Sequence, residues 1–170
     1  MDYGKAVEKM MMMDAASWER HANPWSVWTR VPILPLLSLA VYGRMWWGWW
    51  SAAFVAVLAI WTWLNPRIFP KPENMDNWAS KGVFGERIWL NRRNKPIPPH
   101  HARMAHVLSA AAASGIPVLI YGLIFLDAWA TLAGVIIAAG AKLWFVDRMV
   151  WLFEDMKHLD PDQAGRNHFG

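Results

Sequence analysis

Residues 65–103 read NPRIFPKPENMDNWASKGVFGERIWLNRRNKPIPPHHAR, and this polar stretch separates two long apolar blocks. It carries eight of the 17 Lys and Arg residues in the 170-residue chain. The apolar blocks extend over residues 31–64 and 104–153, and each is longer than the roughly 20 residues that one membrane helix needs. The pattern therefore predicts two membrane-crossing helical hairpins joined by a polar loop.

Each apolar block is interrupted near its middle, the first by Tyr42-Gly43-Arg44 and the second by Asp127. We therefore expect an all-α integral membrane fold with four transmembrane helices as two helical hairpins, and with interfacial amphipathic helices on the cytoplasmic side. The expected spans cover residues 26–43, 46–64, 104–126 and 128–147. The single membrane domain would contain an interfacial helix (1–24), hairpin one (25–64), a cytoplasmic loop with an amphipathic helix at 76–92 (65–103), hairpin two (104–158) and a tail (159–170).

The distribution of charge predicts the orientation of the chain. The net charge is +4 and the pI about 9.6, and the outer turns carry only Arg44 and Asp127. The other Lys and Arg residues lie mainly in the terminal segments and in residues 65–103. In membrane proteins, an excess of Lys and Arg marks the loops on the cytoplasmic side. We therefore expect a multi-pass protein of the inner (plasma) membrane with both termini in the cytoplasm. Membrane lipids, and not nucleic acid, are the expected partners of its basic surface.

Composition narrows the possible chemistry. The 14 Trp residues suit the membrane–water boundary. The absence of Cys excludes thiolate metal ligands, which leaves His, carboxylate and Met side chains. Lys142 is the one charged side chain expected inside a span away from the span ends, which argues against an ion or proton pathway. There is also no nucleotide-binding loop and no Gly-x-Ser-x-Gly elbow.

Four strings resemble a family of small, functionally uncharacterised prokaryotic membrane proteins with four helices. They are HANPWSVWTR (21–30), WLNPRIFPKP (63–72), NWASKGVFGERIWLNRR (77–93) and PIPPHH (96–101). The resemblance covers roughly residues 18–155. It implies no established activity, so the candidate sites have to be argued from the residues themselves.

Histidines of the polar stretch are the first candidate site. His100, His101 and His106 could hold a transition metal, with His21 or Glu86 brought in by packing. None of the three has the i, i+4 spacing that two ligands on one helix face prefer. The alternative is that they lie at the headgroup boundary as anchors. If the protein is an enzyme, its catalytic candidates are His21, Glu86, His100 and His101.

The cytoplasmic end of the last span is the second candidate. Glu154 and His158 are four residues apart and could share a ligand. Alternatively, they form an exposed helix stripe paired with Arg148 and Lys157. Asp147, near the membrane boundary, requires a partner, for which an arginine is expected.

Arginines at the boundary are the third candidate. Arg30, Arg67 and Arg87 could contact a lipid phosphate or another anion, with Asn23 and Asn65 nearby. They could equally be ordinary anchors in the inner leaflet.

Three functions remain open from the sequence. The first is a non-catalytic interaction or accessory subunit of a membrane assembly, packed against other membrane chains or copies of itself, because the small residues around Gly134 and Gly140 suit close helix contact. The second is an enzyme acting on a lipid or other apolar substrate at the cytoplasmic interface through the His/Glu group. The third is transport or sensing of a small anionic or aromatic molecule.

Overall fold

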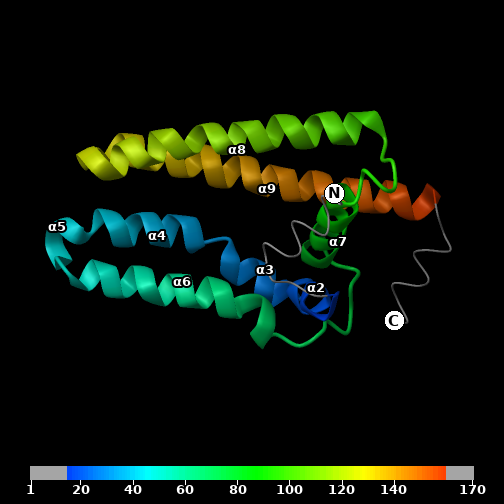
Figure 1. Cartoon of the computed structure of the whole chain (residues 1–170), viewed down its shortest axis with the longest axis horizontal. Coiled ribbons are helices and arrows are strands. Elements are labelled where there is room, and N and C mark those ends of the chain that lie inside the picture. Colours follow the sequence, from blue (N-terminus) through cyan, green and yellow to red (C-terminus); the bar gives the residue numbers. More distant parts are fainter. Residues whose placement is uncertain (1–14, 160–170) are drawn as a thin grey trace.

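The computed structural model describes residues 15–159, and every regular element in that range is a helix. In chain order these are α2 (Ala15–His21), α3 (Pro24–Arg30), α4 (Ile33–Tyr42), α5 (Arg44–Trp47), α6 (Trp50–Ile68), α7 (Trp78–Leu90), α8 (Pro99–Phe125) and α9 (Ala128–Leu159). The predicted all-α class is confirmed. Figure 1 shows α8 beside α9 in one layer and α4 beside α6 in a second, with α2, α3 and α7 gathered at one end. The first part of the predicted 1–24 helix and the 159–170 tail lie outside the described residues, apart from Leu159.

Three of the described helices, α6, α8 and α9, are long and apolar enough to cross a membrane, not four as predicted. The expected span at 26–43 is divided, because α3 ends at Arg30 and α4 begins at Ile33. Pro32 lies at the break, where its missing N–H cannot continue a helix and its ring crowds the preceding turn. The ten residues of α4 extend about 15 Å at 1.5 Å per residue, about half of a bilayer's hydrocarbon core.

Small residues bring α8 and α9 into close contact. A Cβ atom added to Gly115 would lie 2.6 Å from the backbone nitrogen of Ala138, and one added to Gly134 would lie 2.4 Å from that of Leu119. Glycine at such positions lets helix backbones approach closely. Two small residues of α9, Gly134 and Ala138, therefore lie against α8, whereas a Cβ on Gly140 would meet nothing within 4 Å.

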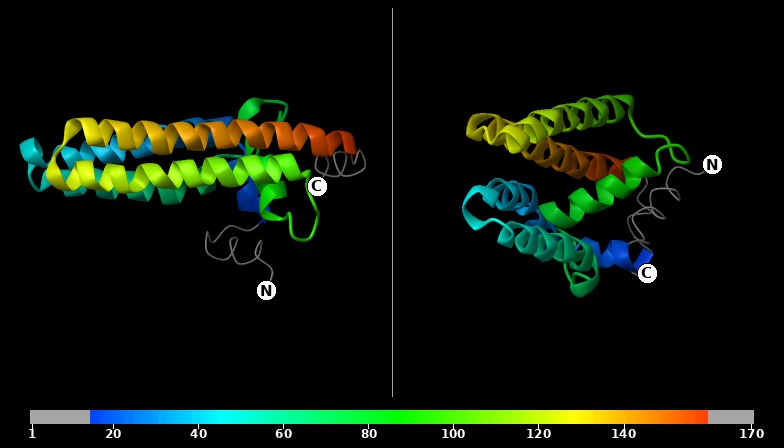
Figure 2. Two further views of the ribbon diagram at one scale, coloured as in Figure 1. Left: turned by 90° about the horizontal axis from the view of Figure 1, so that it is seen from above. Right: turned by 60° about the vertical axis from the view of Figure 1, so that its left-hand side comes forward.

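Helix α7 confirms that the polar stretch contains a helix, which was predicted at 76–92. Asn77 caps it, with its Oδ1 accepting a hydrogen bond of 2.9 Å from the Ser80 N–H. Residues 79, 80 and 82–85 are buried, and α7 crosses between α9 and the α2–α3 segment (Figure 2). A Cβ on Gly85 would lie 1.9 Å from the Met149 carbonyl oxygen. Glycine thus allows α7 to be wedged between the two layers.

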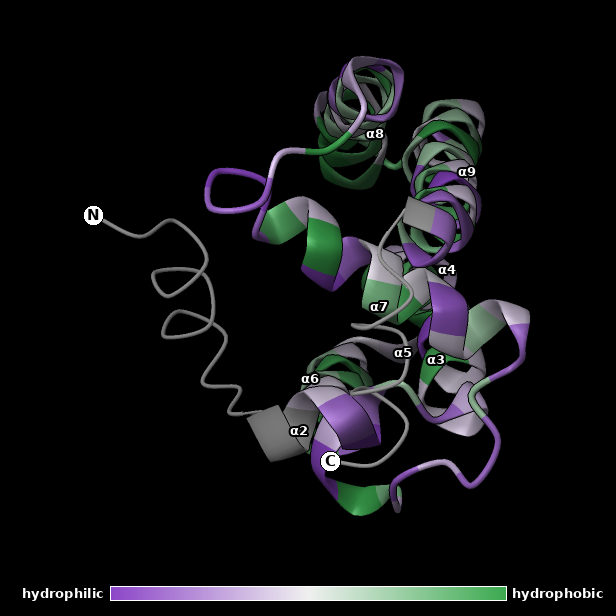
Figure 3. Cartoon of the chain, turned by 90° about the vertical axis from the view of Figure 1, so that its right-hand side faces the viewer, coloured by the Kyte–Doolittle hydropathy of each residue, from purple (hydrophilic) through white to green (hydrophobic). Residues whose placement is uncertain are grey.

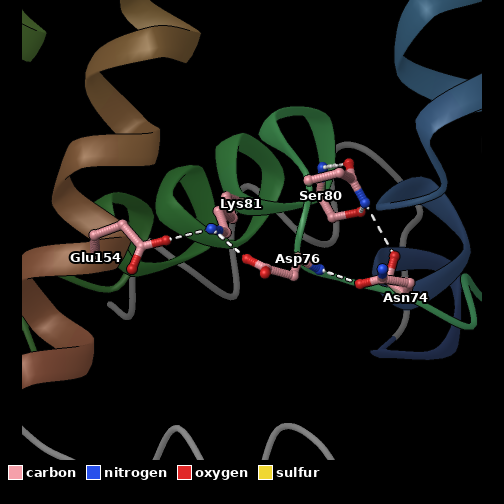
Figure 4. Close-up of polar contacts among 6 residues, drawn as sticks. Asn74, Asp76, Ser80, Lys81 and Glu154 are labelled. Atoms are coloured by element: carbon pink, nitrogen blue, oxygen red, sulfur yellow. Dashed lines mark hydrogen bonds and ion pairs between the residues drawn. The ribbon is translucent and has the colours of Figure 1, made fainter.

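The polar end of the molecule is held together by contacts between elements. Figure 3 shows hydrophilic residues over the loops that enter and leave α7. Lys81 of α7 bridges two carboxylates, Asp76 at 2.5 Å and Glu154 of α9 at 2.6 Å (Figure 4). Glu154 is thus paired with a residue of another helix. The exposed-stripe interpretation had instead expected partners on the same helix.

At the opposite end, the two hairpins are joined through backbone carbonyls. The Tyr42 hydroxyl donates to the Leu126 carbonyl at 2.8 Å, and the Arg44 guanidinium donates to the Leu123 carbonyl at 2.6 Å. Leu126 ends α8 in the left-handed conformation, with φ of 57°. These bonds satisfy carbonyls that the end of α8 leaves without intrahelical partners.

Candidate functional site

A cavity of about 340 Å³ lies where α2, α3, α4 and α7 meet α9, and we call it the α9 cavity. Four of its lining side chains are charged or titratable: His21, Arg30, Glu86 and Lys142. The other lining residues are apolar or aromatic, and they include Trp18, Val27, Leu34, Trp78, Val83, Leu143 and Val146. The α9 cavity therefore combines four polar side chains with mostly apolar walls, as ligand cavities usually do.

His21, the last residue of α2, lines the α9 cavity, and α3 begins three residues later at Pro24. Asn23 caps α3, accepting from the Trp25 N–H at 2.9 Å, and Arg30 at the end of α3 lies beside the His21 ring. A guanidinium nitrogen of Arg30 lies 2.8 Å and 2.7 Å from the two ring nitrogens. Burial, with the positive charges of Arg30 and Lys142, lowers the pKa of His21 to about 3. His21 is therefore a neutral imidazole at physiological pH.

A buried hydrogen-bond chain holds this corner in place. The His21 Nδ1 lies 3.3 Å from the Ser26 hydroxyl, which donates to the Asn65 side-chain oxygen at 2.6 Å. The Asn65 amide then donates to the Thr29 hydroxyl at 2.8 Å. Ser26 and Asn65 are fully buried. Sequence reasoning had linked Asn65 with Arg30, but it missed Ser26 and Thr29, whose signal was a pair of hydroxyls three residues apart on a short helix.

Glu86 and Lys142 form an ion pair across α7 and α9. The Lys142 Nζ lies 2.9 Å from a Glu86 carboxylate oxygen, and the side chains are 54% and 25% exposed. Lys142 is the charge that the sequence placed inside a span, and this pairing shows how it is accommodated there. With Arg30 and Lys142 positive, Glu86 negative and His21 neutral, the four groups sum to one positive charge.

Two indoles complete the lining. The Trp78 Nε1 donates to Asp147 at 3.0 Å, so the polar partner shown for Asp147 is an indole and not the expected arginine. Trp78 also stacks on Trp28, with ring centroids 5.4 Å apart. Trp18 is 2% exposed, and among the described residues its Nε1 has no hydrogen-bond partner. A buried donor without an acceptor costs about 1–3 kcal/mol.

The histidines of the PIPPHH segment lie elsewhere and do not line the α9 cavity. His101 is buried, and its Nε2 lies 2.8 Å from an Asp155 carboxylate oxygen. The His100 ring lies against it, with centroids 4.1 Å apart. His106 is exposed, bonds the Ala102 carbonyl of its own helix and is not in this group. The structure thus separates the predicted His/Glu constellation into His21 with Glu86 and, apart from them, His100 with His101.

Of the three predicted anion-contacting arginines, only Arg30 lines the α9 cavity. The Arg67 guanidinium lies 4.5 Å from the Trp63 ring centroid and donates to the Trp63 carbonyl, both on its own helix. Arg87 is half-buried on α7. The sequence could not show which arginine lines a cavity, because all three lie near Trp residues at an expected membrane boundary.

Comparison with known proteins gives a family but no activity. No curated protein and no solved structure shows significant similarity to this chain. The sequence matches one family over residues 4–168, nearly its whole length. The chain therefore belongs to this family, a family of unknown function designated DUF6653.

Proposed function

We propose that this protein is a non-catalytic membrane protein that binds a monoanionic amphiphile in the α9 cavity. One observation carries the proposal: two cations, one carboxylate and a neutral imidazole share a cavity of about 340 Å³ with apolar and indole walls. The net positive charge matches a single anionic headgroup. The apolar walls can accommodate the part of an alkyl chain, or of a similar apolar group, that is next to the headgroup.

The donors of the cavity favour a carboxylate or phosphate oxygen. Arg30 supplies a planar guanidinium, which binds such groups through paired charge-assisted hydrogen bonds. Lys142 adds a second positive charge, as a compact ammonium group. Charged hydrogen bonds in a partly buried site are worth about 1.5–3 kcal/mol each.

The depth of the site favours a ligand that comes from the membrane. Lys142 lies 14 residues from the start of α9, or about 21 Å along the helix axis. With a hydrocarbon core of about 30 Å, this position is toward the end of the bilayer where α2, α3 and α7 gather. We propose that this end faces the cytoplasm, because it carries most of the Lys and Arg residues. In this proposal α3 and α4 together make a fourth, bent crossing beside α6.

The same geometry disfavours acid–base catalysis in the cavity. A base with a pKa of about 3 is poorly matched to neutral pH, and the Glu86 carboxylate is neutralised by Lys142. Part of the small-residue face of α9, one motive for an accessory subunit, is occupied by α8 at Gly134 and Ala138. Association with other membrane chains stays a prediction from the sequence, and ligand binding is what the geometry supports best.

The test measures binding of radiolabelled decanoate to the protein in nanodiscs of zwitterionic phosphatidylcholine. We expect saturable binding of one decanoate per chain, displaced by unlabelled decanoate but not by decanol or decylamine. Arg30→Gln and Lys142→Gln should each weaken binding about tenfold or more, because each removes one charged donor. Glu86→Gln should strengthen binding, because it raises the net charge of the site by one.

Arg67→Gln is the matched control, since Arg67 stacks on its own helix outside the cavity. It should leave decanoate affinity unchanged. Decanol competing as well as decanoate, or equal affinity in Arg30→Gln, Lys142→Gln and the wild type, would sink the proposal.

A further inference from the structure

We infer that His100, His101 and Asp155 form a binding site for a divalent transition metal, with Zn²⁺ as the best match. The site lies where the beginning of α8 meets the last turns of α9, apart from the α9 cavity. It differs from the set expected from the sequence, because Asp155 is present and His106 is absent.

The spacing of the ligand atoms fits one ion. The His101 Nε2 and an Asp155 oxygen are 2.8 Å apart, and one ligand atom from each of the three residues lies within 4.8 Å of the others. Two ligands bound at about 2.0–2.1 Å in a tetrahedral zinc shell are about 3.3 Å apart. His100 thus has to close in by about 1.5 Å, and its side chain is exposed and able to rotate.

The two histidine rings converge although helix geometry alone would separate them. Neighbouring residues on an α-helix project about 100° apart, and do not normally face each other. The His100 and His101 rings nevertheless have centroids 4.1 Å apart. The His101 side chain is held by burial, and its backbone N–H donates to the Pro98 carbonyl in the first turn of α8. The start of α8 therefore places the two rings together.

The donor set and access also suit zinc. Two imidazoles and one carboxylate are ligands that Zn²⁺ accepts, and three protein ligands leave a fourth position for water or another small ligand. Asp155 is 52% exposed, so an ion can enter from solvent. A bound ion would join the first turn of α8 to the end of α9, and would therefore stabilise the folded chain according to its concentration and affinity.

The experiment titrates Zn²⁺ into metal-stripped full-length protein in detergent at pH 7.5, with bound zinc measured by mass spectrometry and thermal unfolding measured in parallel. We expect one zinc per chain and a rise in Tm that saturates with zinc. His100→Ala and Asp155→Asn should each weaken zinc binding at least tenfold, and the double variant should lose the rise in Tm. Because both side chains are exposed, these variants avoid disturbing the buried His101.

His106→Ala and His158→Ala are the controls, because both histidines are exposed and neither belongs to the group. They should bind zinc as the wild type does. The inference is overturned if the wild type binds no zinc at 100 µM, or if the double variant keeps one zinc per chain with unchanged affinity.

Discussion

Replacing Gly85 with alanine should separate α7 from α9 and so open the wall of the α9 cavity. The added Cβ would lie 1.9 Å from the Met149 carbonyl oxygen, 2.5 Å from its carbonyl carbon and 3.0 Å from its Cα. These are backbone atoms in the middle of a long helix, so no side-chain rotation can relieve the overlap. Restoring an ordinary contact of 3.4 Å requires α7 to move by about 1.5 Å.

That displacement costs packing along the whole α7–α9 contact. A gap of 0.5–1 Å already loses about a quarter to a half of the dispersion attraction between facing atoms. Val83 and Phe84 are buried beside Gly85 and would lose part of their contacts. Overpacking of this kind costs about 1–3 kcal/mol or more, against a total stability of about 5–15 kcal/mol for a typical domain. Glu86 is the next residue, so its ion pair with Lys142 should lengthen as well.

The assay compares Gly85→Ala with Gly140→Ala in detergent, using near-ultraviolet circular dichroism to follow thermal unfolding. Gly140 is the matched control, because it lies inside α9 and a Cβ there meets nothing within 4 Å. We expect Gly85→Ala to lower Tm and to weaken decanoate binding. Gly140→Ala should keep or raise Tm, since alanine favours a helix over glycine by up to about 1 kcal/mol.

The reasoning is refuted if Gly85→Ala unfolds at the wild-type temperature while Gly140→Ala unfolds lower. That result would mean that the close approach of α7 to α9 is not what orders this end of the molecule.

Three further predictions concern polar contacts and are all measured by unfolding. Asn65→Leu should cost about 1–3 kcal/mol, because the buried Ser26 hydroxyl loses its acceptor; an unchanged free energy of unfolding would contradict a structural role for the chain of hydrogen bonds. Because the pKa of His21 is lowered to about 3, this imidazole is protonated in the unfolded chain but neutral in the folded chain between pH 6.5 and about 3. Stability should therefore fall by up to about 1.4 kcal/mol per unit as pH drops below 6.5, and His21→Asn should flatten that profile relative to the wild type. The pKa of Lys81 is raised by Asp76 and Glu154, so its contribution should be constant from pH 6 to 9 and be lost only above its unfolded value of 10.5; Lys81→Met should cost about 0.5–1 kcal/mol across that constant range.

Elements with a strong local pattern could be predicted from the sequence. The length of the apolar blocks predicted the long helices α6, α8 and α9, and a helix was predicted at 76–92, where α7 lies. The small residues of α9 predicted close helix contact, and the structure shows such a contact with α8 at Gly134 but none at Gly140. Each of these signals is contained within one segment of about 10–20 residues, where hydropathy and capping act directly on the backbone.

The break at Pro32 was misjudged for a local reason. A proline in the first turn of a helix is tolerated, so the sequence allowed a continuous span that starts before it. The structure instead ends one helix at Arg30 and begins another at Ile33. Pro32 is compatible with one continuous helix and with a break. The hydrogen bonds that join Ser26 and Thr29 of α3 to Asn65 of α6 favour the break.

The candidate sites depended on distant pairs, and the sequence contains no record of these. Glu86 meets Lys142 across 56 residues, and His101 meets Asp155 across 54. A single sequence shows which residues carry charge, but not which helices become neighbours. The sequence therefore named His21, Arg30 and Glu86 of the α9 cavity and His100 and His101 of the proposed metal site, but it could not show which of them lie together.

One measurement tests the central claim most directly: photolabelling with a decanoate analogue that carries a diazirine on its alkyl chain, followed by peptide mapping. The account predicts adducts on the apolar wall of the α9 cavity, at Leu34, Ala139 or Leu143, and their loss with excess decanoate or in Arg30→Gln. Adducts confined to exposed side chains such as Ile136 and Trp129, unaffected by excess decanoate, would contradict it.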